Sequence, residues 1–272
     1  MDGNGRDVDL TGARASSRPI YRELAPAPDL AEYVACGWVR VVGPRESADA
    51  VPIVPDGCSD ILVSDGVPPR IVGPDTRTRW IKLHAGTVIT GQRLRPGALR
   101  AVLGVRASEL VDTSAALADL ASSARALHSR LDAAGTLNAR LLLLESWVRD
   151  RLAPSARDRA VVAAARVLAR SGADMDRLAT NLGWNVRMLH REFVATCGYG
   201  PKYLQRVVRV QRTVGFARAA GGQLRLSDLA GMSGFSDQAH LTRDFRAIFG
   251  FTPREYLATA EPQLGRWLTE NW

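Results

Sequence analysis

An imperfect internal repeat in the second half of the chain constrains the fold more than any other feature. The first copy, LATNLGWNVRMLHREFVATCGYGPKYL, spans residues 178–204, and the second, LAGMSGFSDQAHLTRDFRAIFGFTPREYL, spans residues 229–257. The second copy has one extra residue after its aromatic turn residue. Beyond it the pattern matches again, so that Phe193 corresponds to Phe245. A repeat of this kind predicts two copies of one supersecondary unit.

Each copy is predicted to form a helix, a tight turn and a second helix. Gly183 and Gly234 lie at the expected turns, where a glycine adopts the positive φ angle of a sharp reversal. Asn185 and Ser236 are the predicted N-caps of the two second helices. In each second helix, apolar residues recur at spacings of three and four, which places them on one buried face. These residues are Leu189 and Phe193 in the first copy, and Leu241, Phe245, Ile248 and Phe249 in the second.

The opposite face of each second helix carries polar side chains that suit base recognition. Arginine and glutamine read base edges through paired hydrogen bonds, and threonine suits a phosphate or a thymine methyl group. A single hairpin with a polar outer face is more often simply solvated. Two copies in one chain favour a pair of recognition helices for the major groove. The candidate DNA-binding residues are Arg187, His190 and Arg191 in the first copy, and Gln238, Ala239, Thr242, Arg243 and Arg246 in the second.

The distribution of charge supports the same interpretation. Residues 1–150 contain 18 basic and 18 acidic residues, whereas residues 151–272 contain 18 and 10, so the second half carries the whole net charge of +8. A basic half next to a neutral half suggests a polyanionic partner, here double-stranded DNA. Only Lys82 and Lys202 among the 36 basic residues are lysines, which in part reflects a coding bias towards arginine.

The segment between the two hairpins, residues 201–222, is predicted to form a basic linker helix. About 18 helical residues span roughly 27 Å, which is close to the roughly 34 Å of one DNA turn. The linker therefore has the length to place two recognition helices in successive major grooves. Arg206, Arg209 and Arg212 on this helix have two open interpretations: contacts with backbone phosphates, or solvation and pairing with acidic neighbours. The first interpretation adds Arg206 and Arg209 to the candidate DNA-binding residues.

The first half has a different pattern, rich in proline, glycine and valine. Short apolar runs between turn signals over residues 19–105 predict an antiparallel sheet or barrel, followed by helices. In residues 136–152 a helical stripe packs either on the sheet or on a second subunit; it consists of Leu137, Leu141, Leu144 and Trp147. The predicted units are a disordered arm at 1–18, a β-rich domain at 19–152, a linker at 153–158, a helical DNA-binding domain at 159–260 and a terminal tail at 261–272.

Several residues of the β-rich part are candidates for an effector pocket. The motif PDGCSD favours a tight turn with capping carboxylates, and a polar site for a small effector is the alternative. The two tryptophans of this part are interpreted as core or as pocket wall, and the two arginines of GQRLRPG as anion ligands or as outer-face residues. The candidates are Trp38, Asp56, Cys58, Asp60, Trp80, Arg93 and Arg95.

The sequence contains no signal for a cofactor, a metal site or a membrane segment. His84 is the only histidine of the strand-rich residues 19–105, so a histidine-rich metal site is not expected there. Cys36, Cys58 and Cys197 are widely spaced, without a disulfide or zinc pattern. The polar N-terminus does not resemble a signal peptide, and no apolar run approaches the roughly 20 residues of a membrane span. We therefore expect a cytoplasmic protein that is not an enzyme.

The motifs LATNLGWNVRMLHREF and LSDLAGMSGFSDQAHLTRDFRAIFGFTPREYL resemble the AraC/XylS family of bacterial transcription regulators over about residues 160–260. The resemblance implies seven helices forming two helix-turn-helix units, and a regulator, more often an activator, that acts with RNA polymerase. Carried over by position, the contacts with DNA fall on Arg187, His190 and Arg191, and on Gln238, Ala239, Thr242 and Arg243. Many members have a polar side chain at the position of Ala239, so readout in the second unit is expected to depend on Gln238 and Arg243.

The first half resembles the β-rich, cupin-like N-terminal domain of a subset of that family. The resemblance rests on YRELAPAPDLAEYVACGWVR, IVPDGCSDILVSDG and ITGQRLRPGALRAVLGVRASELVD. It implies an α+β, two-domain protein in which the first domain binds a small effector or forms a homodimer. Two other classes stay open: a dimeric DNA-binding scaffold without an effector, and a DNA-repair methyltransferase of the Ada type. The latter needs four clustered cysteines around zinc, and this chain has three scattered ones.

Overall fold

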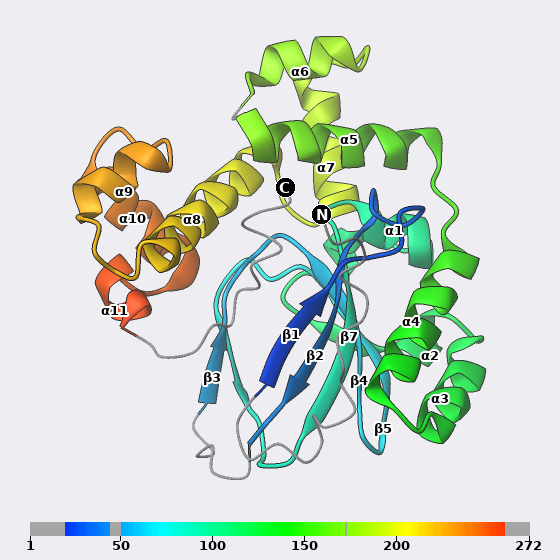
Figure 1. Cartoon of the computed structure of the whole chain (residues 1–272). Helices are drawn as coiled ribbons and strands as arrows, with labels where there is room; N and C mark the ends of the chain where they lie inside the picture. The colour runs from blue at the N-terminus through cyan, green and yellow to red at the C-terminus, as the bar shows by residue number, and fades with distance from the viewer. Residues whose placement is uncertain (1–19, 44–49, 172, 259–272) are drawn as a thin grey trace, which may run out of the picture.

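A six-stranded antiparallel sheet forms the centre of the N-terminal half (Figure 1). The computed structural model describes residues 20–43, 50–171 and 173–258, so the predicted arm and terminal tail lie outside the described residues. The strand order is β1-β2-β7-β4-β5-β8, and β3 and β6 form a separate two-stranded ribbon. The strands are β1 (Ile20–Leu24), β2 (Val34–Val41), β3 (Ala50–Ile53), β4 (Ser59–Ser64), β5 (Val67–Val72), β6 (Arg79–Lys82), β7 (Val88–Leu94) and β8 (Ser114–Ala116).

The side chains of this sheet alternate between a helix-covered face and a second face below the ribbon, as the period of two in a strand requires. In β4, Ile61 and Val63 are buried in the main hydrophobic core, whereas Asp60 and Leu62 line a cavity on the other face. Neighbouring strands follow the same division, because the antiparallel register pairs Trp38 with Gly91. Sequence alternation therefore decides which residues meet the helices and which remain available for a ligand.

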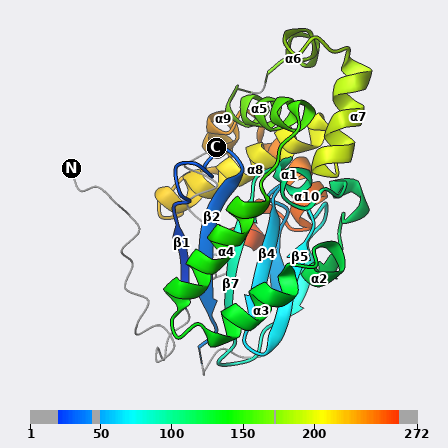
Figure 2. The same cartoon turned by 90° about the vertical axis from the view of Figure 1, so that its right-hand side faces the viewer.

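Helices cover the first face of the sheet (Figure 2). The predicted stripe of residues 136–152 is confirmed as core, since all four of its members are buried. Leu137 and Leu141 pack with strand residues such as Val39, and Leu144 and Trp147 join the main core. These elements are α1 (Ala98–Leu103), the short 3-10 helix η2 (Ala107–Glu109), α2 (Leu117–Leu120), α3 (Ala124–Ala133) and α4 (Leu137–Arg151).

The expected α+β architecture with a β-rich first domain is confirmed, but the cupin-like barrel is not closed. A barrel needs its first and last strands to pair, and in the described part of the chain β1 pairs with β2 alone while β8 pairs with β5 alone. The ribbon strand β3 pairs with β6 instead of extending the sheet. Pro52 within β3 offers no backbone donor for a further neighbour.

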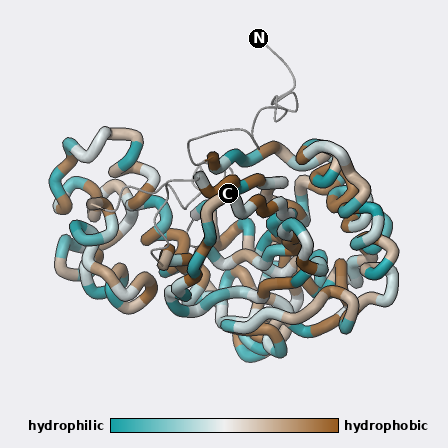
Figure 3. The backbone as a smooth tube through the Cα atoms, turned by 90° about the horizontal axis from the view of Figure 1, so that it is seen from below, coloured by the Kyte–Doolittle hydropathy of each residue, from teal (hydrophilic) through white to brown (hydrophobic). Residues whose placement is uncertain are grey.

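The C-terminal half is helical, and the two predicted hairpins are present. They are α6 with α7 and α9 with α10, joined by the linker helix α8. Each hairpin has its own hydrophobic cluster, and the second hairpin forms a lobe beside the sheet domain (Figure 3). Within the described residues the expected seven helices are α5 (Ala156–Ser171), α6 (Met175–Asn181), α7 (Val186–Cys197), α8 (Pro201–Ala219), α9 (Leu226–Met232), α10 (Gln238–Phe249) and α11 (Pro253–Leu257).

The turns of the two hairpins confirm the role of glycine but correct one cap. Gly183 has a φ angle of 67° and Gly234 one of 80°, both in the left-handed region. Asn185 caps α7 as expected, since its Oδ1 accepts a hydrogen bond from the Met188 amide at 2.8 Å. Ser236 is not the cap of α10; Asp237 is, and it accepts from the His240 amide at 2.7 Å. The extra residue of the second copy moves the cap one position along the chain.

None of the helices in the described residues is long and apolar enough to cross a membrane.

Candidate nucleic-acid interface and ligand cavity

The outer face of α7 presents a cluster of basic side chains. Arg187, His190 and Arg191 are exposed, whereas Leu189 and Phe193 on the opposite side are fully buried. The buried pair anchors the helix on α5 and α8 in the cluster of the first hairpin. The helix therefore presents positive charge and hydrogen-bond donors in the arrangement expected of a recognition helix.

The outer face of α10 is similar but less uniformly basic. Gln238, Ala239, Arg243 and Arg246 are exposed. The Thr242 side chain is half-buried, and its Oγ1 donates to the Gln238 carbonyl at 2.9 Å, within the helix. Its hydroxyl is therefore already engaged, which shifts the polar contacts of this face towards the glutamine and the two arginines.

A buried carboxylate, Asp244, fastens α10 to the linker helix. The Arg206 guanidinium lies 3.0 Å from Asp244 Oδ1, and that of Arg209 lies 3.5 Å from Oδ2. Arg209 also lies over the Phe235 ring, 5.0 Å from its centroid. Of the two interpretations left open by the sequence, pairing with an acidic neighbour is therefore the observed one for these two arginines. Arg212 is engaged as well, and donates to the carbonyls of Ala169 and Arg170.

This pairing changes what substitution of Arg206 should do. If Arg206 contacted a backbone phosphate, Arg206→Ala would lower the slope of DNA affinity against salt concentration by about one released counterion. Because Arg206 pairs with Asp244 and its side chain is 38% exposed, we expect instead an unchanged salt slope and a loss of stability of at most about 1 kcal/mol. Titrations of DNA with the variant at several salt concentrations measure the salt slope. Urea unfolding of the same variant measures the loss of stability. A slope reduced by about one would restore the phosphate role.

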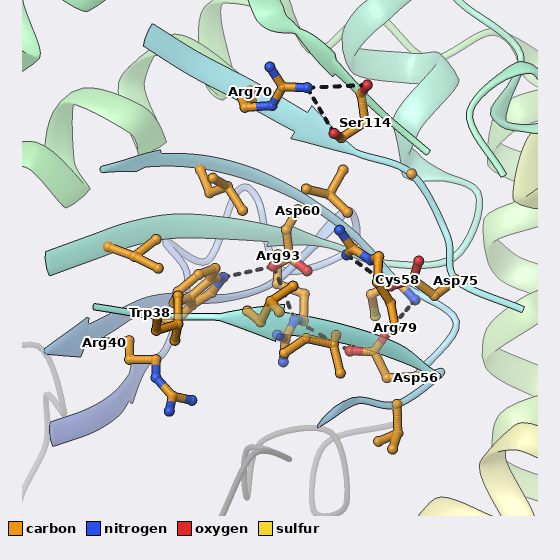
Figure 4. A pocket seen from close by; sticks show the side chains of 18 of the residues that line it. Trp38, Arg40, Asp56, Cys58, Asp60, Arg70, Asp75, Arg79, Arg93 and Ser114 are labelled. Carbon is orange, nitrogen blue, oxygen red and sulfur yellow. Dashed lines mark hydrogen bonds and ion pairs between the residues drawn. The ribbon is translucent and has the colours of Figure 1, made fainter. Parts of the chain in front are cut away.

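A cavity of about 310 Å³ lies between the sheet and the β3–β6 ribbon. Its volume is in the range of pockets that hold small molecules. The side chains of Trp38, Asp56, Cys58, Asp60 and Arg93 all line it, so the structure brings five of the seven candidate effector residues together (Figure 4). They come from β2, the loop between β3 and β4, β4 itself and β7.

Arg93 is the electrostatic centre of this cavity. Its guanidinium lies 3.4 Å from Glu23, 3.5 Å from Asp56 and 3.2 Å from Asp60. Burial tends to lower the pKa of Arg93, but the surrounding carboxylates, Asp60 above all, raise it above its ordinary value. Arg93 is therefore fully committed to carboxylates and stays charged, which argues against its predicted role as a ligand for an anionic effector.

The PDGCSD segment combines both roles that its sequence left open. Asp56 Oδ1 accepts from the Cys58 amide at 2.8 Å and Gly57 has a φ angle of 81°, so a tight carboxylate-capped turn is present. The same Asp56 side chain lines the cavity. Burial raises the pKa of Asp56 from 3.8 to about 6, and the charge of Asp60 adds to this while Arg93 opposes it.

Two candidate residues lie outside the cavity. The Arg95 Nε donates to the Ala31 carbonyl at 3.0 Å, on the other side of the strand end. Trp80 is neither core nor cavity wall: it is 56% exposed, and its ring contacts Phe251, with 5.7 Å between the centroids. Strand alternation would place Arg95 on the same face as Arg93, but β7 ends at Leu94, so the alternation does not extend to Arg95.

Sequence patterns did not reveal several residues that line the cavity, among them Tyr21, Asp75 and Arg79. Asp75 and Arg79 pair at 3.1 Å. Asp75 lies in GPDTRTRW, which has an ordinary turn composition, and only the pairing of β6 with β3 brings this segment over the sheet. Sheet pairing between distant strands leaves no local signal, so these residues could not be assigned before the fold was known.

The cavity-lining loop at residues 54–58 also contacts the helical half. Gln211 on α8 donates to the Pro55 carbonyl at 2.7 Å, and the Tyr199 hydroxyl donates to the Gly57 carbonyl at 2.6 Å. Both hydrogen bonds are buried. The side chains of Asp56 and Cys58 thus line the cavity, while the carbonyls of Pro55 and Gly57 accept hydrogen bonds from the helical half.

The segment at residues 75–80 makes a second connection of this kind. The Tyr203 hydroxyl donates to the Thr76 carbonyl at 2.7 Å, and Thr78 Oγ1 donates to the Phe249 carbonyl at the end of α10 at 2.6 Å. The cavity residues Asp75 and Arg79 belong to the same segment. The linker helix α8, the residues just before it and the end of α10 are therefore in contact with segments that form the cavity wall.

The three cysteines are free and buried. Burial raises the pKa of each thiol, so the reactive thiolate form is disfavoured. Within the described ranges, no group of three or more histidine, cysteine or acidic residues is arranged to hold a metal ion.

Comparison with known proteins identifies both halves at the level of the domain. Residues 22–116 match a family described as a domain of unknown function (DUF6597), and residues 178–259 match a family described as a helix-turn-helix domain. No curated protein matches the chain.

Solved structures of ToxT from Vibrio cholerae resemble the chain at a distance. An apo variant from strain SCE256 is 13% identical, with a TM-score of 0.39, over 89% of this chain and 97% of its own. ToxT from strain O395 is 10% identical, with a TM-score of 0.38, over 88% and 96%. The repeat, its two hairpins and the domain match show that the C-terminal half contains a helix-turn-helix domain of the AraC type, which follows an N-terminal domain of unknown function.

Proposed function

We propose that this regulator reads a specific DNA site with α7 and α10, and that a small molecule in the N-terminal cavity controls this binding. The observation that carries the proposal is the double role of residues 54–58, which line the cavity with side chains and bind the DNA-binding half with carbonyls. A ligand that moves the backbone at Asp56 or Cys58 also moves the carbonyl of Gly57, which lies between them. The hydrogen bond from Tyr199 then changes with it.

The length of the linker helix α8 supports paired reading of DNA. The linker helix α8 has 19 residues, which corresponds to about 28 Å and is close to the roughly 34 Å of one DNA turn. Arg187, His190 and Arg191 contact one major groove in this proposal, and Gln238, Arg243 and Arg246 the next. Ala239 allows only close apolar contact with a base.

Substituting Arg243 tests base reading most simply. Because Arg243 is exposed on α10 and a good bidentate base contact contributes about 1–3 kcal/mol, Arg243→Ala should weaken binding to the preferred site by that amount and relax the base preference there. Arg191→Ala should do the same in the first block. Competition of the preferred duplex against random duplexes measures the specificity ratio.

Arg254→Ala on α11 is a suitable control, since Arg254 is exposed but lies outside the recognition helix. It should change both affinities only slightly. If Arg243→Ala weakened random DNA as much as the preferred site, the role of Arg243 would be phosphate binding and not base reading.

A regulator without an effector is the second candidate function. The neutral first half would then act as a dimerisation module. The cavity and its connection to α8 favour the sensor, because a module that only dimerises does not need a buried carboxylate network around an open space. A rise in melting temperature upon addition of a bound small molecule would separate the two.

The remaining parts of the proposal come from the family resemblance. They are activation of transcription through RNA polymerase, assembly of a homodimer through residues 19–152, and action in a bacterial cytoplasm. The DNA-repair alternative of the Ada type is disfavoured, because its chemistry needs a reactive thiolate and burial keeps these three thiols protonated.

A further inference from the structure

A cleft of about 360 Å³ lies where the two helix-turn-helix hairpins meet. The C-terminal end of α5, one side of the linker helix α8 and the turn between α9 and α10 line it. The end of α5 packs in the hydrophobic cluster of the first hairpin, whereas the turn beside Phe235 packs in that of the second. In Figure 1 the helix α8 runs from one hairpin to the other. The cleft therefore combines parts of both hairpins, and it shares no lining residue with the N-terminal cavity.

The charged side chains of this cleft are basic. Arg170, Arg209 and Arg212 line it, and among its described lining residues there is no aspartate or glutamate. Arg209 has a carboxylate partner outside the lining, since its Nη2 lies 3.5 Å from Asp244 Oδ2. The same carboxylate also pairs with Arg206 at 3.0 Å. One negative charge is thus shared between two arginines, and it offsets the charge of Arg209 only in part.

Arg212 brings a positive charge to the cleft at a fixed position. Its Nη2 donates to the carbonyls of Ala169 and Arg170 at the end of α5. Such terminal carbonyls attract a cation through their partial negative charge, and this holds the guanidinium in place without neutralising it. Burial lowers the pKa of Arg212, and no carboxylate in the described part of the chain offsets this effect. The charge of Arg212 is therefore available to an anion in the cleft.

Two polar atoms on the wall of the cleft lack a hydrogen-bond partner. Ser233 is only 2% exposed, and its Oγ forms no hydrogen bond with the described residues. The Nε of Arg209 is buried and has no acceptor among them either. Buried polar atoms are nearly always hydrogen-bonded, and a guanidinium N–H can only donate. A ligand rich in acceptor oxygens would supply what these two atoms lack.

We propose that this cleft binds a phosphate group, with Arg212, Arg209 and Ser233 as its donors. A phosphate combines negative charge with several strong acceptor oxygens, and arginine is well suited to recognise it. The arginines would repel a cation, and an apolar molecule would leave the buried donors unsatisfied. Two sources supply such a group: the DNA backbone between the two recognised blocks, and a soluble phosphate compound. The first source rests on the proposed reading of DNA by α7 and α10, whereas the second is independent of it.

Neutral methylphosphonate linkages in the preferred duplex test the DNA source. Each linkage replaces one charged phosphate between the two blocks. At the phosphate that occupies the cleft, the replacement should weaken binding of the full chain by roughly tenfold, because a charge-assisted hydrogen bond is lost there. Ser233→Ala should lose a similar factor with the unmodified duplex and nothing further with that modified duplex. Such non-additivity is the sign that the hydroxyl and the phosphate interact directly.

Calorimetric titration with inorganic phosphate at constant ionic strength tests the soluble source. The full chain should bind phosphate saturably in the absence of DNA, and Ser233→Ala and Arg212→Gln should each bind it roughly tenfold more weakly. Ser233→Ala removes a hydroxyl that has no partner in the described residues, so the fold should keep its stability. Arg212→Gln removes the charge and retains an N–H donor for the carbonyls of α5.

Two exposed residues of α3, outside the cleft, provide matched controls. Ser129→Ala removes a hydroxyl and Arg125→Gln removes one positive charge. Neither variant should change the affinity for inorganic phosphate or the pattern of methylphosphonate effects.

The outcomes separate the two sources from each other and from the proposed function. A loss at one backbone position that is coupled to Ser233→Ala assigns the phosphate to DNA, and phosphate binding that both cleft variants weaken assigns it to a soluble compound. Equal effects at every backbone position, together with inorganic phosphate that binds variants and wild type alike or not at all, would overturn the proposal. DNA reading by α7 and α10 would still stand in that case if Arg243→Ala relaxed the base preference.

Discussion

Phe245→Ala should lower the free energy of unfolding of the second hairpin by about 3–5 kcal/mol, the usual cost of removing a large buried aromatic side chain. Phe245 is fully buried, and its ring contacts those of Phe249 and Tyr256 at centroid distances of 4.8 and 5.7 Å. The substitution leaves a cavity under the recognition face of α10. Urea unfolding followed by circular dichroism measures the loss.

The effect on DNA should be confined to one part of the site. The first hairpin has its own hydrophobic cluster around Phe193, so a Phe245→Ala variant should keep the sequence preference of α7 and lose that of α10. Phe193→Ala should give the reverse. Phe216→Ala, at a partly buried position on α8, is the control and should cost clearly less. Equal losses from Phe216→Ala and Phe245→Ala would contradict the assignment of the core.

Asp56→Asn should stabilise the protein at neutral pH. Burial raises the pKa of Asp56 from 3.8 to about 6, so between these values the folded state binds more protons than the unfolded state. Stability contributed by this group is therefore present below about pH 4 and is lost as the pH rises to about 6. A shift of about two units corresponds to roughly 3 kcal/mol. Since asparagine stays neutral, the variant should gain up to that amount over the wild type by about pH 7.

The measurement is the difference in unfolding free energy between Asp56→Asn and the wild type, taken at steps from about pH 4 to pH 7. The difference should grow with pH across this window. Asp119→Asn removes one exposed carboxylate from α2 and controls for net charge. A difference that shrinks with increasing pH would mean that Arg93 stabilises the Asp56 carboxylate more than burial destabilises it.

The helical half was predictable from the sequence because its signals are local. Gly183 and Gly234 mark the turns, and the spacing of Leu189 and Phe193 defines the buried face of α7 within a few residues. The wrong N-cap of α10, Ser236 instead of Asp237, arose because both residues are good caps and lie next to each other. The pairing of Arg206 with Asp244 was one of two open interpretations, since a helical pattern does not show which residues of two helices meet.

The cavity was predictable only in part. Asp56, Cys58 and Asp60 alternate with other residues along one segment. Arg93 lies on β7, which pairs with β4 on one side and with β2, the strand of Trp38, on the other. Asp75 and Arg79 reach the same place through the β3–β6 ribbon. The open sheet in place of a barrel has the same origin, because strand partners across dozens of residues are chosen by the whole core and not by local composition.

Selection of bound sequences from a random DNA pool, with the full chain and in the presence and absence of cell extract, tests the central claim most directly. Two recognition helices joined by α8 should enrich two short blocks about one helical turn apart, roughly 10 base pairs from centre to centre. If the same two blocks were enriched only in the presence of cell extract, DNA binding by the protein would require a small molecule from the extract. A single block, or no enrichment under either condition, would contradict a regulator that reads DNA with both α7 and α10.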